Sequence, residues 1–343
     1  MNLVNHQFRL AARPTGLPKR TDWKYTEEPV ADPATGQVVI KVLYLSLDPA
    51  MRGWMNDARS YIEPVKIGDV MRAGGVGRVI ASANPGFAVG DHVTGVLGVQ
   101  KFTTSDGKGL TKVDPSAGTK PGGKQVPLPV FISALGMPGL TAYFGLLDVG
   151  QAKAGDTVVV SGAAGAVGMV VGQIAKIKGC RVVGIAGGPE KCAYVVKELG
   201  FDACVDYKTE DVKKALHQHC PQGVNVYFDN VGGEILDAVL LFLARGARVV
   251  ICGAISQYCS TTGVKGPSNY LSLLVNGARM EGFVVFHYAA RYAEGIRDMA
   301  TWMAQGKLKS KEDIVDGLET FPETLCKLFS GENFGKLVLK VAE

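Results

Sequence analysis

Three glycines, Gly162, Gly165 and Gly168, stand three residues apart and could bind the diphosphate of a dinucleotide. An apolar, β-branched run precedes them and apolar residues at helical spacing follow, which predicts a strand, a tight turn and the start of a helix. Without side chains, the backbone N–H groups of such a turn can approach phosphate oxygens, and the helix dipole favours their negative charge. A turn that serves only helix–strand packing is the alternative. Because both flanks match, we interpret the segment as a dinucleotide site.

The residues after the next expected strand indicate which dinucleotide binds. In the NAD form of this motif, an acidic residue about 20 positions beyond the glycines binds the ribose 2′-hydroxyl. Here Gly187 and Gly188 occupy that place, and Lys191 follows. A carboxylate would repel a 2′-phosphate, whereas an ammonium group attracts it, so we expect NADP(H) with Lys191 at the 2′-phosphate. Two points stay open. Glu190 is an acid near this place, but it heads the next helix, where a role as a partner of the helix dipole explains it equally well. Lys191 could instead be a solvent-facing lysine of that helix.

The expected elements around these residues predict two kinds of domain. Residues 36–128 contain short apolar runs separated by glycine turns, which predicts a partly open β-barrel. From residue 129 strands and helices alternate, which predicts a doubly wound parallel α/β sheet. The six expected strands are 157–161, 181–185, 203–206, 224–229, 247–252 and 280–285, with helices from 165, 189 and 209. A helix at 292–305 precedes apolar runs, the last at 337–341, that we expect to return to the first domain.

The composition narrows the function classes. A chain of 343 residues with 47% apolar and 20% charged side chains is typical of a globular protein with two domains. A net charge of +5 without a basic cluster does not favour nucleic acid as a partner. Two charge-free windows, 125–147 and 157–175, are interpreted as buried core rather than membrane spans. The N-terminus lacks an apolar signal segment, and all seven cysteines lie at or beyond Cys180, so we expect free thiols in the cytoplasm.

Seven motifs in one order give the chain a resemblance to a known family. They span residues 47–53, 136–143, 163–168, 228–233, 252–258, 282–285 and 333–336. The chain resembles the zinc-independent medium-chain dehydrogenase/reductases, and within them the NADPH-dependent alkenal/alkenone double-bond reductases, which include prostaglandin and curcumin reductases. The resemblance implies a GroES-like catalytic domain at 1–128, a Rossmann NADP-binding domain at 129–290, and a segment at 291–343 that returns to the catalytic domain. It also implies a homodimer.

The resemblance implies an NADP site, carried over residue by residue. Tyr207 would contact the 2′-phosphate beside Lys191, and Met137 and Thr141 would lie near the nicotinamide. The full expected set is Met137, Thr141, Ala163, Ala164, Gly165, Ala166, Val167, Gly168, Gly188, Lys191, Tyr207, Asn230, Cys252, Gly253, Ala254, Ile255, Ser256, Tyr258, Phe283, Val284, Val285 and Asn333.

The implied reaction is hydride transfer from NADPH to the β-carbon of an α,β-unsaturated aldehyde or ketone. Negative charge then develops on the carbonyl oxygen as an enolate, where a hydrogen-bond donor lowers the barrier. We assign that role to the Tyr258 hydroxyl together with the ribose 2′-hydroxyl, and the proton for the α-carbon to Tyr61, Tyr258 or water. Tyr61, Met51 and Arg52 are expected on the substrate side, although Arg52 could equally be a structural charge that anchors the barrel to the cofactor domain. Relatives commonly carry an aromatic residue at the place of Ala50, so the size of the pocket is open.

No metal is expected. Zinc-dependent relatives use a cysteine early in the first domain, but this chain has none before Cys180. Cys180, Cys192, Cys204 and Cys220 lack the two-residue spacing of a metal knuckle, and His217 and His219 lie in a polar segment typical of a solvated helix face. This disfavours an alcohol dehydrogenase. A zinc-free quinone oxidoreductase and a non-catalytic NADP-binding regulatory protein remain the alternatives.

Overall fold

The computed structural model describes residues 1–116 and 125–342 and forms two compact units. The first comprises residues 1–133 and 312–343, and the second residues 134–311. These boundaries differ from the expected 128 and 290. Helix α8 (Tyr292–Ala304) belongs to the second unit because the Tyr143 hydroxyl lies 2.7 Å from a carboxylate oxygen of Asp298 and 3.2 Å from one of Glu294.

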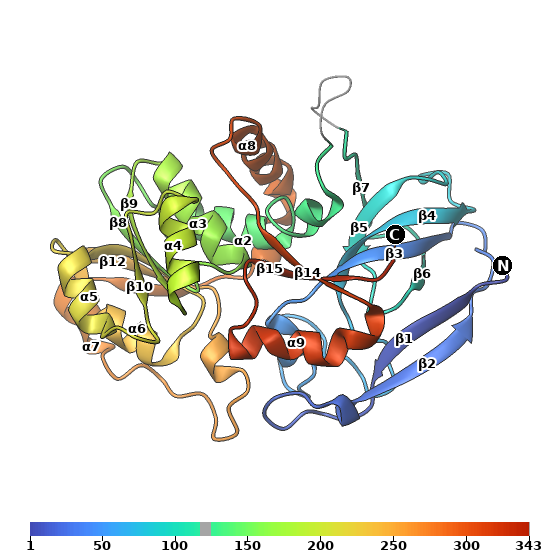
Figure 1. The fold of residues 1–343 in the computed structure, drawn as a ribbon, viewed down its shortest axis with the longest axis horizontal. Helices are drawn as coiled ribbons and strands as arrows, with labels where there is room; N and C mark the ends of the chain where they lie inside the picture. Colours follow the sequence, from blue (N-terminus) through green and yellow to red (C-terminus); the bar gives the residue numbers. More distant parts are fainter. Residues whose placement is uncertain (117–124, 343) are drawn as a thin grey trace. The chain divides into compact units, whose positions relative to one another are not determined.

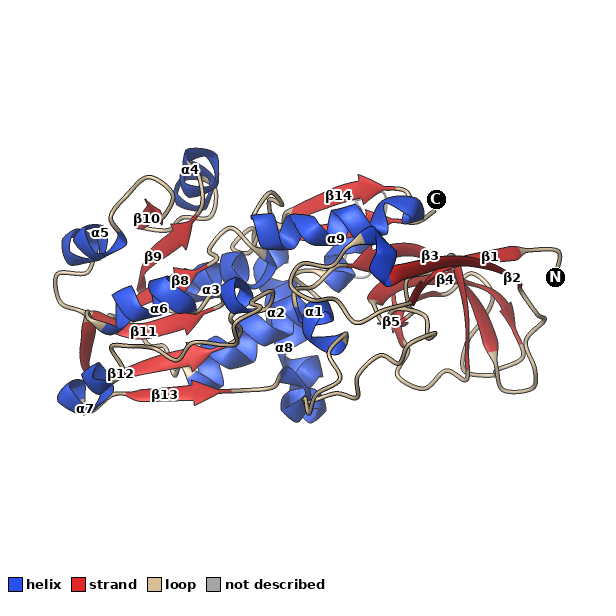
Figure 2. Cartoon of the chain, turned by 90° about the horizontal axis from the view of Figure 1, so that it is seen from below, coloured by secondary structure: helices blue, strands red, loops and turns tan. Residues whose placement is uncertain are grey.

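The second unit is built on a six-stranded parallel sheet, as expected. The strand order is β10-β9-β8-β11-β12-β13, and Figure 2 shows the strands as one layer in that order. The strands are β8 (Thr157–Ser161), β9 (Arg181–Ala186), β10 (Ala203–Asp206), β11 (Val224–Asp229), β12 (Leu243–Ile251) and β13 (Arg279–Gly282). The order reverses between β8 and β11, which is the switch point where doubly wound folds bind dinucleotides.

Helices cover both faces of this sheet (Figure 1). One face carries α2 (Met137–Phe144), α3 (Ala166–Ile177) and α4 (Pro189–Lys197), and the other carries α5 (Val212–His219), α6 (Gly233–Leu240) and α7 (Leu271–Asn276). All five residues of β8 are buried, as the uniformly apolar run predicts for a central parallel strand. Helix α3 packs closely against the Phe201 side chain, because a Cβ atom at Gly172 would lie 1.8 Å from the Phe201 ring.

Three expected element ends differ from the structure by three or four residues. Helix α5 begins at Val212 rather than 209, because the Asp211 carboxylate caps it by accepting from the N–H groups of Lys213 and Lys214. Strand β12 begins at Leu243, four residues earlier than expected. The strand expected at 280–285 ends at Gly282, and a 3-10 turn at 285–291 follows.

The first unit contains a two-stranded and a seven-stranded sheet. Strands β1 (Val4–Leu10) and β2 (Trp23–Pro29) pair with each other, and the larger sheet has the order β14-β15-β3-β4-β5-β7, with β6 beside β3. Its strands are β3 (Val38–Ser46), β4 (Gly74–Ser82), β5 (His92–Val96), β6 (Phe102–Ser105), β7 (Thr111–Val113), β14 (Glu312–Asp316) and β15 (Lys336–Lys340). Strand β15 pairs antiparallel with β3, so the C-terminal segment returns to the first unit as expected. Helices α1 (Ala50–Trp54) and α9 (Phe321–Ser330) complete it.

The two charge-free windows take their expected places. Residues 157–175 form β8 and most of α3, and 125–147 contain α2. Among the described residues, none of the helices has the length and apolar character needed to cross a membrane.

We expect Gly172→Ala to lower the free energy of unfolding by about 1–3 kcal/mol, because the new methyl group overlaps the Phe201 ring. Chemical denaturation followed by circular dichroism measures the change. Gly282→Ala is the matched control, because no atom lies within 4 Å of the position its Cβ would take. Equal stability of the two variants would contradict the close packing of α3.

Candidate active site

The carboxyl ends of the parallel strands bring most of the expected cofactor residues to one edge of the second unit. The glycine turn follows β8, the Gly188 turn follows β9, and Tyr207 follows β10. Asn230 follows β11, residues 252–258 follow β12, and residues 283–285 follow β13. Segments far apart in the sequence therefore share one edge, because parallel strands end on the same side of a sheet.

The three glycines differ in what they do locally. Gly162 adopts a φ of +61°, which suits a residue without a side chain at the tight turn. A Cβ at Gly168 would lie 2.2 Å from the Gly162 carbonyl oxygen, so only glycine lets α3 pack this closely on the turn. Gly165 is the N-cap of α3, and its absent side chain would meet one atom within 4 Å, the Gly162 carbonyl oxygen at 3.1 Å. The first N–H groups of α3, which have no intrahelical acceptor, therefore lie beside an unobstructed turn.

An acidic residue does stand near the expected 2′-phosphate site, but its carboxylate is engaged. Asp206, at the end of β10, accepts hydrogen bonds from the N–H groups of Gly188 (2.7 Å) and Lys208 (3.1 Å) and from the Thr209 hydroxyl (3.0 Å). Burial opposes ionisation of Asp206, but these hydrogen bonds outweigh it and lower its pKa. Asp206 could not be identified from the sequence, because only the folded loop shows where its carboxylate points.

Two side chains lie over the glycine pair that follows β9. A Cβ at Gly187 would lie 2.9 Å from the Tyr207 hydroxyl and 3.0 Å from the Lys208 Cε atom. Tyr207 remains 43% exposed. Lys191 lies in the first turn of α4, three residues after the Gly188 cap. The Tyr207 and Lys208 side chains therefore lie beside the turn from which α4 begins, and the role of Lys191 stays a prediction.

A buried carboxylate joins the central strands at the switch point. One Asp229 oxygen accepts four hydrogen bonds, from the hydroxyls of Ser161 (3.0 Å) and Tyr227 (2.8 Å) and from the N–H groups of Val231 (3.0 Å) and Gly232 (2.8 Å). Burial raises the pKa of Asp229, although these donors act in the opposite direction. The Asp229 backbone carbonyl accepts from the N–H groups of residues 252 and 253. Asp229 lies inside the motif 228–233, but no role for it was expected from the sequence.

Asn230 is fixed by the same strands. Its N–H donates to the Ser161 hydroxyl (2.9 Å), and its side-chain amide donates to the Ser161 carbonyl (2.7 Å). These bonds join the last residue of β8, which precedes the glycine turn, to the first residue of the loop that follows β11.

Tyr258 folds back onto its own loop. The Ala254 N–H donates to the Tyr258 hydroxyl oxygen at 3.1 Å, and a Cβ at Gly253 would lie 2.9 Å from that oxygen. In this bond the hydroxyl is the acceptor, so the bond does not use the phenolic proton. A backbone donor on the oxygen also makes the hydroxyl a better donor to a developing oxyanion.

The residues expected near the nicotinamide lie on α2 and after β13. The Thr141 hydroxyl donates to the Met137 carbonyl within α2 (2.8 Å), and Met137 is 41% exposed at the helix start. Phe283 packs at the carboxyl side of β11, with its ring centroid 6.4 Å from that of Phe228.

The expected substrate residues and Asn333 belong to the first unit. Tyr61 is 53% exposed, and its hydroxyl accepts from the Trp54 indole N–H (3.3 Å). Met51 is fully buried. Arg52 is also buried, and its guanidinium donates to the carbonyls of residues 14 and 16 and to the Asn56 side chain. These three acceptors all lie in the first unit, so the contacts hold the guanidinium within that unit, and both roles considered for Arg52 stay predictions.

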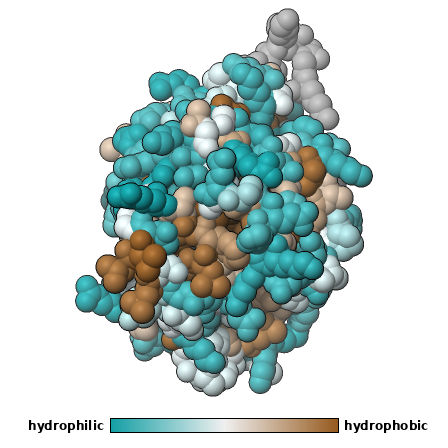
Figure 3. Space-filling model, turned by 90° about the vertical axis from the view of Figure 1, so that its left-hand side faces the viewer, coloured by the Kyte–Doolittle hydropathy of each residue, from teal (hydrophilic) through white to brown (hydrophobic). Residues whose placement is uncertain are grey.

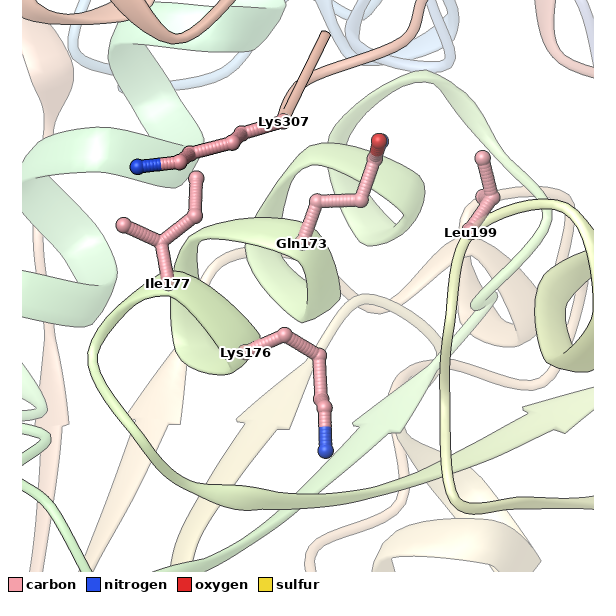
Figure 4. A pocket seen from close by; sticks show the side chains of 5 residues that line it. All are labelled: Gln173, Lys176, Ile177, Leu199 and Lys307. Atoms are coloured by element: carbon pink, nitrogen blue, oxygen red, sulfur yellow. The ribbon is translucent and has the colours of Figure 1, made fainter. Parts of the chain in front are cut away.

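A surface pocket of about 360 Å³ lies away from the glycine turn (Figure 4). Gln173, Lys176 and Ile177 line it from the second half of α3, with Leu199 and Lys307 opposite. A second hollow, of about 480 Å³, lies beside the Tyr258 loop, between the start of α6 and residues 256–268. The second hollow is the one that adjoins the candidate site.

Two family models match the chain, one to each kind of unit. The first, described as the N-terminal domain of oxidoreductase, matches residues 6–113. The second, described as zinc-binding dehydrogenase, matches residues 166–302. In the part of the chain that the structure describes, there is no group of three or more His, Cys, Asp or Glu side chains placed to share a metal ion.

Known proteins match over nearly the whole chain. NADPH-dependent curcumin reductase of Escherichia coli is 44% identical, over 98% of this chain and 97% of that protein. Prostaglandin reductase 1 of Mus musculus is 42% identical over 92% of each. The crystal structure of CurA from Vibrio vulnificus in complex with NADPH is 45% identical, covers 98% of this chain and 99% of its own, and has a TM-score of 0.91. The chain belongs to the medium-chain dehydrogenase/reductase family of oxidoreductases, in the group that contains these curcumin and prostaglandin reductases.

Proposed function

We propose that this protein is an NADPH-dependent reductase of the carbon–carbon double bond in α,β-unsaturated aldehydes and ketones. One observation carries the proposal: a glycine turn fit for a diphosphate and a tyrosine loop with a polarised hydroxyl follow β8 and β12 at one edge of the sheet. The similarity to NADPH-dependent reductases over nearly the full length supports both the cofactor and the reaction.

The chain's own residues account for the preference for NADPH. When bound, NADPH supplies the hydride. The unobstructed N-terminus of α3 would hold its diphosphate, and Lys191, Tyr207 and Lys208 would surround its 2′-phosphate. The nearby Asp206 carboxylate accepts hydrogen bonds from the N–H groups of Gly188 and Lys208, and the two lysines would supply the positive charge that attracts the phosphate.

Tyr258 is proposed as the donor to the substrate carbonyl oxygen. An isolated alkene resists hydride attack because the resulting carbanion cannot disperse its charge, whereas conjugation places that charge on oxygen. A hydroxyl already aimed by the Ala254 N–H needs little reorganisation to stabilise the oxygen as charge develops. The proton for the α-carbon would come from Tyr61, Tyr258 or water, and Tyr61 and Met51 stay predictions for the substrate side.

We also propose that the enzyme works without zinc and in the cytoplasm. The donor set described above supports the first point. The seven cysteines, all free in the structure, support the second, because they suit a reducing compartment.

A homodimer through α7 and β13 is proposed for the assembly. Strand β13 ends the sheet order and is an edge strand. Next to it in sequence, α7 and the residue before it expose Tyr270 (57%), Leu271 (58%), Leu274 (80%) and Val275 (81%). Figure 3 shows an apolar patch on the left-hand side of Figure 1. An edge strand can pair with its own copy about a two-fold axis, so a second copy would cover both features.

Replacing Lys191 by Ala is expected to weaken NADPH binding about 10- to 100-fold and leave NADH binding unchanged, because one charge-assisted contact to the 2′-phosphate is lost. Tyr207→Phe should act in the same direction with a smaller effect. Titration of cofactor fluorescence gives both dissociation constants. Lys197→Ala, in the last turn of the same helix, is the control, and an equal loss for NADH in Lys191→Ala would refute the assignment.

The Tyr258→Phe change is expected to slow hydride transfer to an enone about 100- to 1,000-fold, since the oxyanion loses its donor. NADPH affinity should stay within about twofold. Stopped-flow absorbance of NADPH in single turnovers measures the step. Tyr25→Phe is the control, on an exposed tyrosine of the first unit, and an unchanged rate in Tyr258→Phe would remove Tyr258 from the mechanism.

A double change, Leu274→Glu with Val275→Glu, should convert the dimer to a monomer, because charges would be buried against the second copy. Light scattering after gel filtration measures the molar mass. Val89→Glu, at an exposed valine of the first unit, should leave the mass unchanged. A double variant that remains dimeric would place the interface elsewhere.

A further inference from the structure

Tyr292, which has no part in the site proposed so far, lies between two segments that are expected at the nicotinamide. It is the first residue of α8. Its hydroxyl donates to the Val285 carbonyl oxygen at 3.1 Å and lies 3.7 Å from the Met137 sulfur. Val285 comes after β13, and Met137 is the first residue of α2. One hydroxyl therefore joins two segments that are far apart in the sequence.

Helix α8 gives this hydroxyl a firm support. Helices α2 and α8 lie side by side (Figure 2), and a Cβ at Gly295 would lie 3.0 Å from the Leu140 side chain. The Tyr143 hydroxyl of α2 contacts a carboxylate of α8, and Arg291, just before the helix, forms an ion pair with Asp148. The start of α8 is therefore fixed relative to α2.

The packing of the Tyr292 ring does not require its hydroxyl. The ring centroid lies 6.3 Å from that of Phe144, a contact that a phenylalanine would also make. Burial raises the pKa of Tyr292, so the hydroxyl keeps its proton at neutral pH and stays a donor. A carbonyl oxygen is a stronger acceptor than a thioether sulfur, so the proton goes to Val285 and the Met137 side chain packs beside the same oxygen.

We propose that Tyr292 is a positioning residue for hydride transfer, whose hydroxyl holds Met137 and Val285 where they orient the nicotinamide ring. It acts through these two neighbours. The proposal rests on the proposed function, because it concerns the nicotinamide end of that enzyme's cofactor site.

The two ends of the cofactor would respond differently to loss of this hydroxyl. Charge-assisted contacts to the diphosphate and the 2′-phosphate, at the glycine turn and Lys191, would supply most of the affinity. Hydride transfer depends instead on where the nicotinamide lies, and a displacement of about 1 Å can slow such a step about 100-fold. We therefore expect the rate to change while the affinity does not.

The fluorescence of bound NADPH tests the effect on the cofactor without any substrate. Because the nicotinamide is the emitting group, a less restrained ring loses part of the enhancement that accompanies binding. We expect Tyr292→Phe to lose part of this enhancement at saturation, with an NADPH dissociation constant within about twofold of the wild type. Tyr288→Phe is the matched control, because Tyr288 belongs to the turn at 285–291 and its ring stacks on Phe144 at 4.7 Å.

Single turnovers with an enone test the effect on the reaction. Tyr292→Phe should slow hydride transfer about tenfold, and Tyr288→Phe should leave it unchanged. Met137→Leu keeps an apolar side chain but removes the sulfur. In the double variant of Tyr292 and Met137, the loss should be smaller than the product of the two single losses, because both changes act on one contact.

Three results would overturn the proposal. They are an unchanged fluorescence enhancement or an unchanged rate in Tyr292→Phe, equal losses in Tyr288→Phe, and fully multiplicative losses in the double variant. The second would show a general loosening of the aromatic side chains around Phe144. A wild-type protein that binds NADPH but does not reduce an enone would refute the proposed reaction instead, and the fluorescence comparison would still decide whether Tyr292 restrains the nicotinamide.

Discussion

Four hydrogen bonds converge on one oxygen of the buried Asp229 side chain, and the carboxyl edge of the second unit depends on them. A buried carboxyl group without partners would cost several kilocalories per mole, so the donors must stay in place. They come from β8, from β11 and from the loop that follows β11. Through its backbone carbonyl the same residue also holds the loop after β12. One residue therefore sets the relative positions of the glycine turn, Asn230 and the Tyr258 loop.

The two ends of the candidate cofactor site use different physical means. At the proposed adenosine end the chain offers charge, with lysines at 191 and 208, and the nearby Asp206 carboxylate is held by backbone N–H groups. At the other end it offers geometry, with the Tyr258 hydroxyl fixed by the Ala254 N–H. In the proposed enzyme the first arrangement would select the cofactor, and the second would act only when charge develops on a substrate oxygen.

The sequence was sufficient for features that repeat or that only glycine can supply. Central strands buried on both faces are uniformly apolar, and a turn with positive φ and close helix packing leaves glycines at fixed spacing, so the sheet and the turn could be predicted. The sequence was not sufficient where hydrogen bonds between distant residues determine the position of a side chain or helix. This is so for the hydrogen bonds that hold the Asp206 carboxylate and for those that join the buried Arg52 to residues 14 and 16. It is also so for the contact between Tyr143 and α8. The motif match identified Tyr258, but not the backbone donor on its oxygen.

In the proposed reaction, hydride goes to a carbon that is conjugated with a carbonyl, and the carbonyl itself is retained. This can be measured by incubating the enzyme with NADPH that carries deuterium at the transferred position and with an aryl-substituted enone, followed by NMR of the product. We expect a saturated ketone with the deuterium on the former β-carbon. An allylic alcohol with deuterium on the carbinol carbon would contradict it, because the chain would then reduce the carbonyl as an alcohol dehydrogenase does.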